Sequence, residues 1–288
     1  MSINRIFPIV IAAAGLVIGV QQYTSLREGD RALLAVKDRV ADTVRRGGTP
    51  QEGATVILSG TPVIEEKAFD PAFGIAPDTL DLTRKARITQ WTENCGAKSC
   101  SYALKLVDQE IPSGRFRTER GHENYGALLF ASIHRPASFT IDNMPVSDDF
   151  IAHLGQPTRI EISPEDYSKF PDTIKANLSL NPDGSLSSRY PAGVGDQLYE
   201  FSGVPAAPYT IVGTFADGKV IPLRDFRRNW VRPGLLSIDE LYDRAALAHR
   251  RDYILPLLLA GFLLFAGASW LIFNRMASRH PSTSKLEA

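Results

Sequence analysis

Cysteine is scarce in this sequence, neither sign of charge dominates, and the common catalytic motifs are missing. Two cysteines among 288 residues exclude a disulfide-dense scaffold and a zinc site built from four thiolates. Lysine plus arginine and aspartate plus glutamate number 32 each, so no basic field exists to attract nucleic acid. The sequence contains no G-x-S-x-G, P-loop, H-E-x-x-H or C-x-x-C motif. We therefore expect a protein that is not an enzyme, has no catalytic residue, and uses no cofactor or metal.

Long apolar runs, in contrast, are present near both ends of the chain. Residues 253–273 are twenty-one residues without a charge, a length that crosses a hydrocarbon core of about 30 Å. Tyr253 and Trp270 stand near the ends of this run, where aromatic rings favour the membrane interface. A second run follows Arg5 and fits either a signal peptide or an uncleaved anchor. Because no small-x-small cleavage site follows its apolar core, we favour an uncleaved anchor that spans residues 6–23.

Each apolar run adjoins a segment with helical periodicity. Within residues 24–49, Leu33, Val36 and Val40 recur at spacings of three and four, which predicts an amphipathic helix. Its apolar face fits three arrangements: on the membrane surface, against a copy of itself, or as a cap on the soluble domain. Residues 237–252 predict a second such helix, which leads into the C-terminal run.

Residues 50–236 have the pattern of one mainly β domain. Short alternating or β-branched segments are separated by glycine and proline, and Asp217-Gly218 predicts a tight turn between two strands. Alternating segments on both sides of Cys95 and Cys100 predict a hairpin that brings the two sulfur atoms within disulfide reach. We favour this disulfide over a pair of free thiols, and over a metal site without a histidine near by in the sequence.

His122 and Glu123 are the cluster that most suggests acid–base chemistry. Adjacent side chains on a strand or turn point apart, however, and the pair lacks the spacing of metal ligands. A structural turn is therefore the preferred interpretation.

A charged segment before Trp91 alternates Arg84 and Ala86 against Lys85 and Arg87. Its basic residues fit two interpretations: they approach lipid headgroups, or they form an ordinary solvated strand face.

Small residues repeat at a spacing of seven in the C-terminal run, and they would let another helix approach closely. These helix–helix contact candidates are Ala260, Gly261, Gly267 and Ala268. The partner is either the N-terminal run of the same chain or a helix of another chain.

Several blocks occur in a distinctive order: LSGTPVIEEKAFDPAFGI, LTRKARITQWTE, SYALKLVD, RTERGHEN and YPAGVGDQLYEFS, followed by LLLAGFLLFAGASWLI. From about residue 55 to residue 273, this order resembles the transmembrane protein 43 family, also called LUMA. The resemblance implies an N-terminal span, a hydrophilic domain outside the cytosol, a group of C-terminal spans, self-association and a role in organising membranes. This chain departs from the pattern, because one span rather than a group stands near its C terminus.

Together these patterns predict an integral membrane protein in which two transmembrane α-helices flank one mainly β (α+β) extracytosolic domain. The predicted order is a cytosolic N terminus at 1–5, the anchor at 6–23, an amphipathic juxtamembrane helix at 24–49, the hydrophilic domain at 50–236, a pre-membrane helix at 237–252, the span at 253–273 and a cytosolic tail at 274–288.

The expected function is to organise or scaffold membrane protein assemblies through the extracytosolic domain. The alternatives are a membrane-anchored lipid-binding domain and, less favoured, a membrane-bound enzyme that uses His122 and Glu123. Expected partners are the lipid bilayer, further copies of the chain and other membrane proteins. Arginines (23) outnumber lysines (9), which favours a bacterial inner membrane with a periplasmic domain over a eukaryotic endoplasmic reticulum or nuclear envelope.

Overall fold

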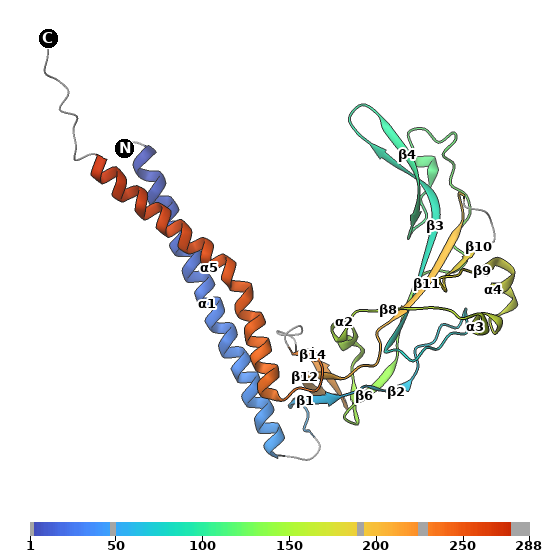
Figure 1. The fold of residues 1–288 in the computed structure, drawn as a ribbon, viewed down its shortest axis with the longest axis horizontal. Helices are drawn as coiled ribbons and strands as arrows, with labels where there is room; N and C mark the ends of the chain where they lie inside the picture. The colour runs from blue at the N-terminus through green and yellow to red at the C-terminus, as the bar shows by residue number, and fades with distance from the viewer. Residues whose placement is uncertain (1–2, 47–49, 189–192, 224–229, 278–288) are drawn as a thin grey trace, which may run out of the picture. The chain divides into compact units, whose positions relative to one another are not determined.

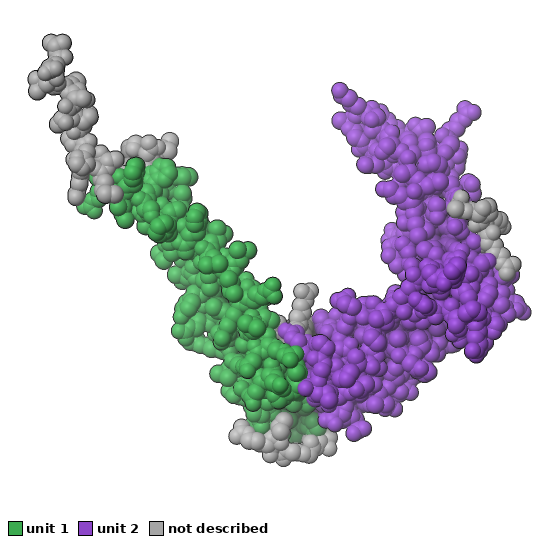
Figure 2. Space-filling model, viewed as in Figure 1, with its two compact units in different colours: residues 1–57, 224–230, 236–288 green, residues 58–223, 231–235 purple. Residues whose placement is uncertain are grey.

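The computed structural model describes residues 3–46, 50–188, 193–223 and 230–277. The chain divides into two compact units, a helical unit and a sheet unit (Figure 2). The helical unit contains residues 1–57, 224–230 and 236–288, and the sheet unit contains residues 58–223 and 231–235. In the sequence, two candidate membrane helices therefore flank a mixed α+β domain that is rich in sheet.

Two long helices, α1 (Ile3–Arg46) and α5 (Ile238–Ala277), lie side by side in the helical unit (Figure 1). Both contain a stretch that is long and apolar enough to cross a membrane. The predicted anchor at 6–23 and the predicted juxtamembrane helix at 24–49 are continuous in α1 as far as Arg46. The predicted pre-membrane helix and the C-terminal span are likewise continuous in α5. The prolines inside these helices, Pro8 and Pro256, lie within the apolar runs. No proline therefore lies where an apolar run joins its amphipathic segment.

The two helices run antiparallel, and their apolar runs lie at the same level. Gly15, in the middle of the first run, lies against the backbone of Ala260 and Leu264 in the second. Beyond the runs, charged side chains pair across the helices: Lys37 Nζ lies 2.6 Å from Asp239 Oδ1. In an antiparallel pair of this kind, both apolar runs can lie in the hydrocarbon core of the same bilayer.

A stripe at spacings of three and four covers the side of α1 that faces α5. In the membrane-length part this stripe is made of small residues, whereas farther along it contains Leu33, Val36 and Val40, which are at most 2% exposed. The apolar face predicted from the periodicity is therefore buried within the chain. It is not available to the membrane surface or to a second copy.

In the described residues the strands form two seven-stranded sheets, which lie in the sheet unit except for the first three residues of β1. In the first, the strand order is β1-β12-β13-β7-β6-β2, with β14 paired to β12. Its strands are β1 (Thr55–Gly60), β2 (Val63–Glu66), β6 (Ser138–Ile141), β7 (Met144–Val146), β12 (Tyr209–Ala216), β13 (Lys219–Pro222) and β14 (Val231–Pro233).

In the second sheet the order is β4-β3-β11-β10-β9, with β5 paired to β3 and β8 paired to β11. Its strands are β3 (Asp81–Cys95), β4 (Cys100–Val107), β5 (Ile133–Pro136), β8 (Thr158–Ile160), β9 (Leu178–Leu180), β10 (Leu186–Ser188) and β11 (Gln197–Gly203).

Local sequence explains the turns and the short helices of this unit. Asp217-Gly218 joins β12 to β13 with both residues at positive φ, as the sequence predicts for a tight hairpin. Asp142 and Asn143, which also have positive φ, join β6 to β7 in the same way. The short helices are η1 (Ser113–Arg115), η2 (Asp148–Phe150), α2 (Ile151–Leu154), α3 (Pro164–Ser168) and α4 (Asp172–Asn177).

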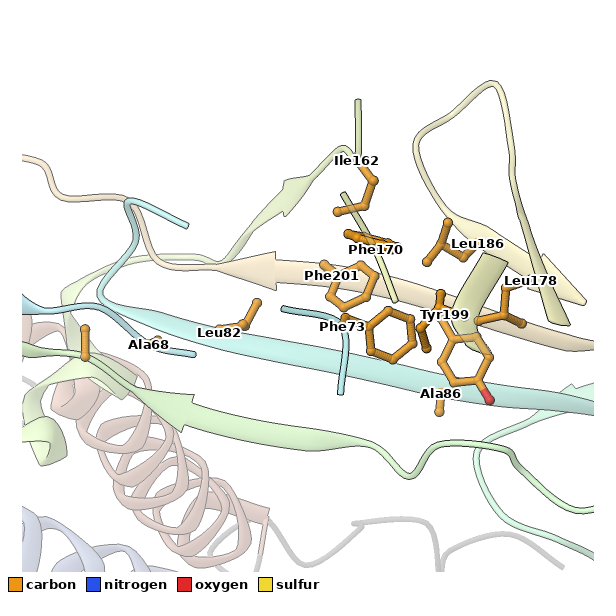
Figure 3. Close-up of a cluster of buried hydrophobic side chains, with 12 residues drawn as sticks. Ala68, Phe73, Leu82, Ala86, Ile162, Phe170, Leu178, Leu186, Tyr199 and Phe201 are labelled. Atoms are coloured by element: carbon orange, nitrogen blue, oxygen red, sulfur yellow. The ribbon is translucent and has the colours of Figure 1, made fainter. Parts of the chain in front are cut away.

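The core of the second sheet is a cluster of apolar side chains between the inner faces of β3 and β11 and the loops and helices that cover them (Figure 3). Its buried members are Ala68, Phe73, Leu82, Ala86, Ala137, Ile162, Phe170, Ile174, Leu178, Leu186, Tyr199 and Phe201.

We predict that Gly15→Leu loosens the pair of long helices. A Cβ at Gly15 would lie 2.9 Å from the backbone oxygen of Ala260, whereas a Cβ at Gly261 meets nothing within 4 Å. Overpacking of this kind costs about 1–3 kcal/mol. The full chain in detergent should therefore show an earlier loss of helical circular dichroism on heating for Gly15→Leu, while Gly261→Leu, the matched control, should unfold like the native chain. Equal effects of the two substitutions would contradict the helix pairing.

Candidate functional site

The long strand β3 is the element on which the distinctive sequence blocks meet. It has 15 residues, and its two edges pair with β11, β4 and β5. Residues at even positions from Leu82 to Gln90 are buried, and those at odd positions from Thr83 to Thr89 face outward. This alternation agrees with the predicted pattern of the charged segment. It also places a guanidinium group on the buried face.

Arg84 is that buried group, and it forms an ion pair with Asp70 of the D-P-A-F-G loop. Arg84 Nη1 lies 2.5 Å from Asp70 Oδ2, and the two residues are 4% and 0% exposed. Arg84 also donates to the carbonyl oxygen of Ala131 from Nε (3.0 Å) and Nη2 (2.8 Å). Both interpretations of Arg84 from sequence, the lipid-facing and the solvated one, are therefore wrong. Burial of a charge requires a partner and further hydrogen bonds, and Arg84 has both.

Phe73 places the same loop at the centre of the aromatic core. Its ring makes edge contacts with Phe130, Phe170 and Phe201, at centroid distances of 5.0, 5.9 and 5.3 Å. Figure 3 shows the last two of these rings beside Phe73. The guanidinium carbon of Arg84 lies 4.8 Å from the centroid of the Phe73 ring, a cation–π distance. The loop is thus held to β3 by an ion pair and by aromatic packing together.

Two buried polar side chains of β11 fasten the segment at residues 127–130 over the sheet. Gln197 donates to the Ala127 carbonyl oxygen (2.8 Å) and accepts from the Leu129 N–H (2.9 Å). The Tyr199 hydroxyl accepts from the Phe130 N–H (3.1 Å), and burial raises the pKa of Tyr199 above its ordinary value. A neutral hydroxyl is therefore retained in the core.

The G-H-E-N turn has a structural role in the described part of the chain. Asn124 occupies the edge of β3 beyond the end of β11: its Oδ1 accepts from the Trp91 N–H (2.6 Å), and its Nδ2 donates to the Trp91 carbonyl oxygen (3.0 Å). The His122 ring stacks on Tyr102 at 3.8 Å and meets Trp91 edge-on at 4.8 Å. The Asn124 amide thus continues the hydrogen bonding that a neighbouring strand would supply.

His122 and Glu123 direct their polar atoms to different groups. His122 Nδ1 lies 3.2 Å from the Thr118 carbonyl oxygen, and Glu123 Oε1 accepts from the Gly121 N–H at 3.0 Å. The N–H groups of Gly121 and of Glu123 itself hold the pKa of the Glu123 carboxyl below its ordinary value. This arrangement suits a turn and does not join the two side chains as an acid–base pair.

Cys95 and Cys100 form a disulfide across the end of the β3–β4 hairpin, where they are register partners. The Glu93 carboxylate lies close enough to both sulfur atoms for three ligand atoms to fall within 4.8 Å of one another. The sulfur atoms are bonded to each other, however, whereas a cysteine binds a metal ion through its free thiolate. The two cysteines therefore link the ends of β3 and β4 covalently.

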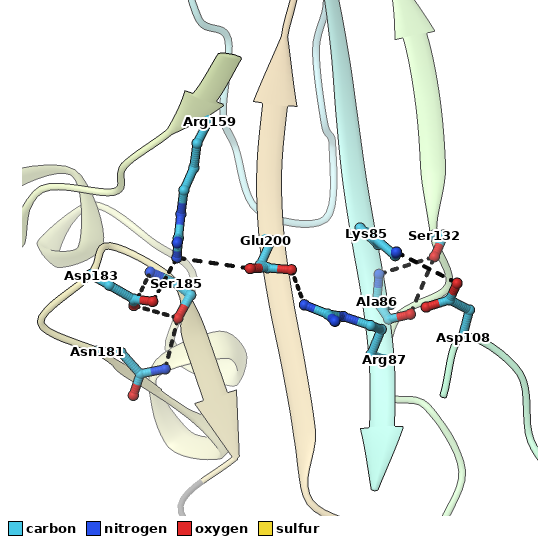
Figure 4. Close-up of polar contacts among 10 residues, drawn as sticks. All are labelled: Lys85, Ala86, Arg87, Asp108, Ser132, Arg159, Asn181, Asp183, Ser185 and Glu200. Carbon is cyan, nitrogen blue, oxygen red and sulfur yellow. Dashed lines mark hydrogen bonds and ion pairs between the residues drawn. The ribbon is translucent and has the colours of Figure 1, made fainter. Parts of the chain in front are cut away.

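The outward face of the second sheet carries a chain of ion pairs (Figure 4). Arg87 pairs with Glu200 on β11, and Arg159 of β8 reaches both Glu200 (4.0 Å) and Asp183 (2.8 Å). The Ser185 hydroxyl and N–H, followed by Arg159, lower the pKa of Asp183 to about 2. The Arg87 and Glu200 side chains are 24% and 29% exposed, so Arg87 faces outward as the alternation predicts but is only partly solvated.

The four small residues predicted for helix contact divide between two faces of α5. Ala260 and Gly267 are buried, and each lies against α1. Gly261 and Ala268 are exposed. The residues of α1 that complete this contact, Gly15 and Gly19, were not identified from sequence, although their G-x-x-x-G spacing is a known signal for close helix approach.

Two comparisons with known proteins both identify similarity to transmembrane protein 43. A family model described as transmembrane protein 43 matches residues 84–284. The chain is also similar to a transmembrane protein 43 homolog of Drosophila melanogaster, with 23% identity over 279 residues that cover 84% of this chain and 69% of the relative. No solved structure matches the chain.

We predict that Arg84→Met destabilises the sheet unit far more than Lys85→Met. Removing Arg84 leaves Asp70 charged and buried, which costs about 3–5 kcal/mol. Lys85 is an exposed neighbour with a surface pair to Asp108 at 3.6 Å, and such pairs contribute less than about 1 kcal/mol. Urea unfolding of the full chain in detergent, followed by tryptophan fluorescence, measures both losses.

The combined variant Asp70→Asn with Arg84→Met provides the control for this pair. The double variant no longer has an unpaired buried charge. Its loss of stability should therefore be smaller than the sum of the losses measured for Asp70→Asn alone and for Arg84→Met alone. Additive losses would show that the two side chains act independently.

Proposed function

Because this chain belongs to the transmembrane protein 43 family, we propose that it is a two-span membrane protein that organises membrane protein assemblies through its sheet unit. The observation that carries this proposal is the use made of the distinctive motifs. The D-P-A-F-G loop and the G-H-E-N turn both brace the charged strand β3, the first by pairing Asp70 with Arg84 and the second by bonding Asn124 to Trp91. Residues used in this way maintain a rigid shape, which is what a scaffold presents to its partners.

The same observation supports a role without catalysis. His122, the best acid–base candidate in the sequence, is packed between aromatic rings, and Glu123 accepts from the backbone of its own turn. A catalytic group needs a substrate within hydrogen-bond reach of its polar atoms. We therefore rank the enzyme that uses His122 and Glu123 behind the scaffold, and the lipid-binding domain between them.

In the proposed topology, both chain ends lie on one side of the membrane and the sheet unit lies on the other. The level apolar runs of α1 and α5 support two crossings by one antiparallel pair. The Cys95–Cys100 disulfide supports an oxidising environment for the sheet unit, which a periplasm or an endoplasmic reticulum lumen supplies. The similar fly protein is eukaryotic, which supports the lumen of the endoplasmic reticulum. The excess of arginine over lysine supports a bacterial periplasm.

The topology predicts glycosylation at Asn177 when the full chain is made with endoplasmic reticulum membranes. Asn177-Leu178-Ser179 is an acceptor sequence, and Asn177 is exposed at the end of α4. The chain should gain one glycan, which a glycosidase removes and which Asn177→Gln abolishes. Pro281→Asn, placed in the Asn177→Gln chain, makes an acceptor sequence in the tail with Ser282 and Thr283. A glycan on the tail but none on Asn177 would reverse the proposed topology.

The scaffold proposal is tested by cross-linking the full chain in native membranes. We expect the chain in covalent species larger than the monomer, and we expect Arg84→Met to reduce them, because this variant disrupts the sheet unit and leaves α1 and α5 intact. Lys85→Met serves as the matched control and should retain the native pattern. Recovery of the native chain as monomer alone would refute the proposal.

A further inference from the structure

Strand β4 forms an open edge of the second sheet in the part of the chain that the structure describes. It pairs with β3 along one side, from Cys100 opposite Cys95 to Val107 opposite Ile88. The strand order of the sheet ends at β4. Unpaired N–H and C=O groups along an exposed edge are a template for pairing with another strand.

The alternation of the β3–β4 ladder determines which backbone groups of β4 point outward. On β3, the backbone groups of Thr89 and Trp91 point away from β4, because they bond to Asp196 and Asn124. The residues opposite Thr89 and Trp91 are Leu106 and Leu104, so their N–H and C=O groups point away from β3. Tyr102 follows in the same alternation. No described residue is hydrogen-bonded to the outward backbone groups of these three residues.

The two edges of the hairpin are treated differently. Beyond the end of β11, the edge of β3 is closed by the Asn124 side chain. In the described part of the chain the β4 edge has no such cover, and two leucines on it are exposed: Leu104 is 44% exposed and Leu106 is 38% exposed. Exposed apolar side chains beside unpaired backbone groups indicate a surface that is covered in an assembly.

The pattern of β4 is complementary to itself. In antiparallel pairing of two copies centred on Leu104, Leu104 of one copy lies opposite Leu104 of the other, and Tyr102 lies opposite Leu106. Apolar side chains on the same face then meet in every pair, and Lys105 lies opposite Ala103. A register centred on Lys105 would instead place two lysines opposite each other, which is unfavourable. The charge pattern thus favours the register centred on Leu104 over the one centred on Lys105.

We propose that β4 is a self-association surface, on which the β4 strands of two copies of this chain pair antiparallel about Leu104 and join their sheets into one. This proposal deepens the proposed function, because it rests on the chain forming assemblies and identifies one surface that forms them. It can fail alone: cross-linked species in native membranes that do not involve β4 would leave the scaffold proposal standing.

The test uses the full chain in lipid nanodiscs or detergent with Ala103→Cys as the background. In the proposed register the two introduced thiols are two residues apart along the paired strands, within reach of a short bismaleimide. The native cysteines are bonded to each other and do not react without reductant. We expect a covalent dimer in this background, and none when the thiol is placed by Glu165→Cys on α3.

Charge at Leu104 then distinguishes self-pairing from other contacts. Leu104→Lys and Leu104→Glu, each added to the background, place like charges opposite each other, and each should lower the dimer yield by roughly tenfold. Mixing the two proteins places Lys opposite Glu and should restore a heterodimer, recognised by its mass. An unbroken Cys95–Cys100 disulfide and an unchanged unfolding temperature show that both variants are folded.

Three results would overturn the proposal. The first is no covalent dimer in the Ala103→Cys background. The second is an undiminished dimer yield in both Leu104→Lys and Leu104→Glu. The third is no heterodimer when these two variants, each with a reduced yield alone, are mixed.

Discussion

The buried ion pair between Asp70 and Arg84 is the interaction on which the sheet unit depends. A guanidinium group on the inner face of β3 is tolerated because a carboxylate, a carbonyl oxygen and two aromatic rings surround it. Asp70 in turn accepts from the Ala72 N–H at 3.0 Å, which shapes the loop that presents Phe73. A charged contact therefore fixes the position of an apolar core, and replacement by two well-packed apolar residues would retain burial without specifying the loop in the same way.

Sequence predicts those parts of this fold that depend on short-range pattern. The alternation of β3, the hairpin closed by Cys95 and Cys100 and the turn at Asp217-Gly218 are all encoded within a few residues. The burial of Arg84 was also encoded, since alternation placed it on the face of Ala86. It was assigned to the surface because charge usually implies solvation. The partner that makes its burial acceptable lies fourteen residues earlier, and periodicity carries no information about such a pairing.

The helical unit shows the same division between local and distant information. Periodicity identified each helical segment, but the continuity of α1 depends on there being no breaker between its apolar and amphipathic parts. Small residues in the C-terminal apolar run were identified from sequence, but which residues of the two runs face each other is fixed by the antiparallel register. Gly29 illustrates this: it leaves room for the His249 ring, and neither residue stands out in the sequence. A glycine that accommodates a side chain from a distant segment can be recognised once the pairing is known.

The two edges of the β3–β4 hairpin can be compared as solutions to one problem. An unpaired edge favours aggregation, and proteins usually protect it with charge, proline, a bulge or a covering segment. The β3 edge is protected by Asn124, a side chain from a motif that sequence had singled out for chemistry. The β4 edge has Lys105, but the N–H of this residue points toward β3, and the outward groups belong to Tyr102 and two leucines. Among the described residues one edge of this disulfide-closed hairpin is protected and the other is not, which is best explained if the open edge receives a strand from another copy.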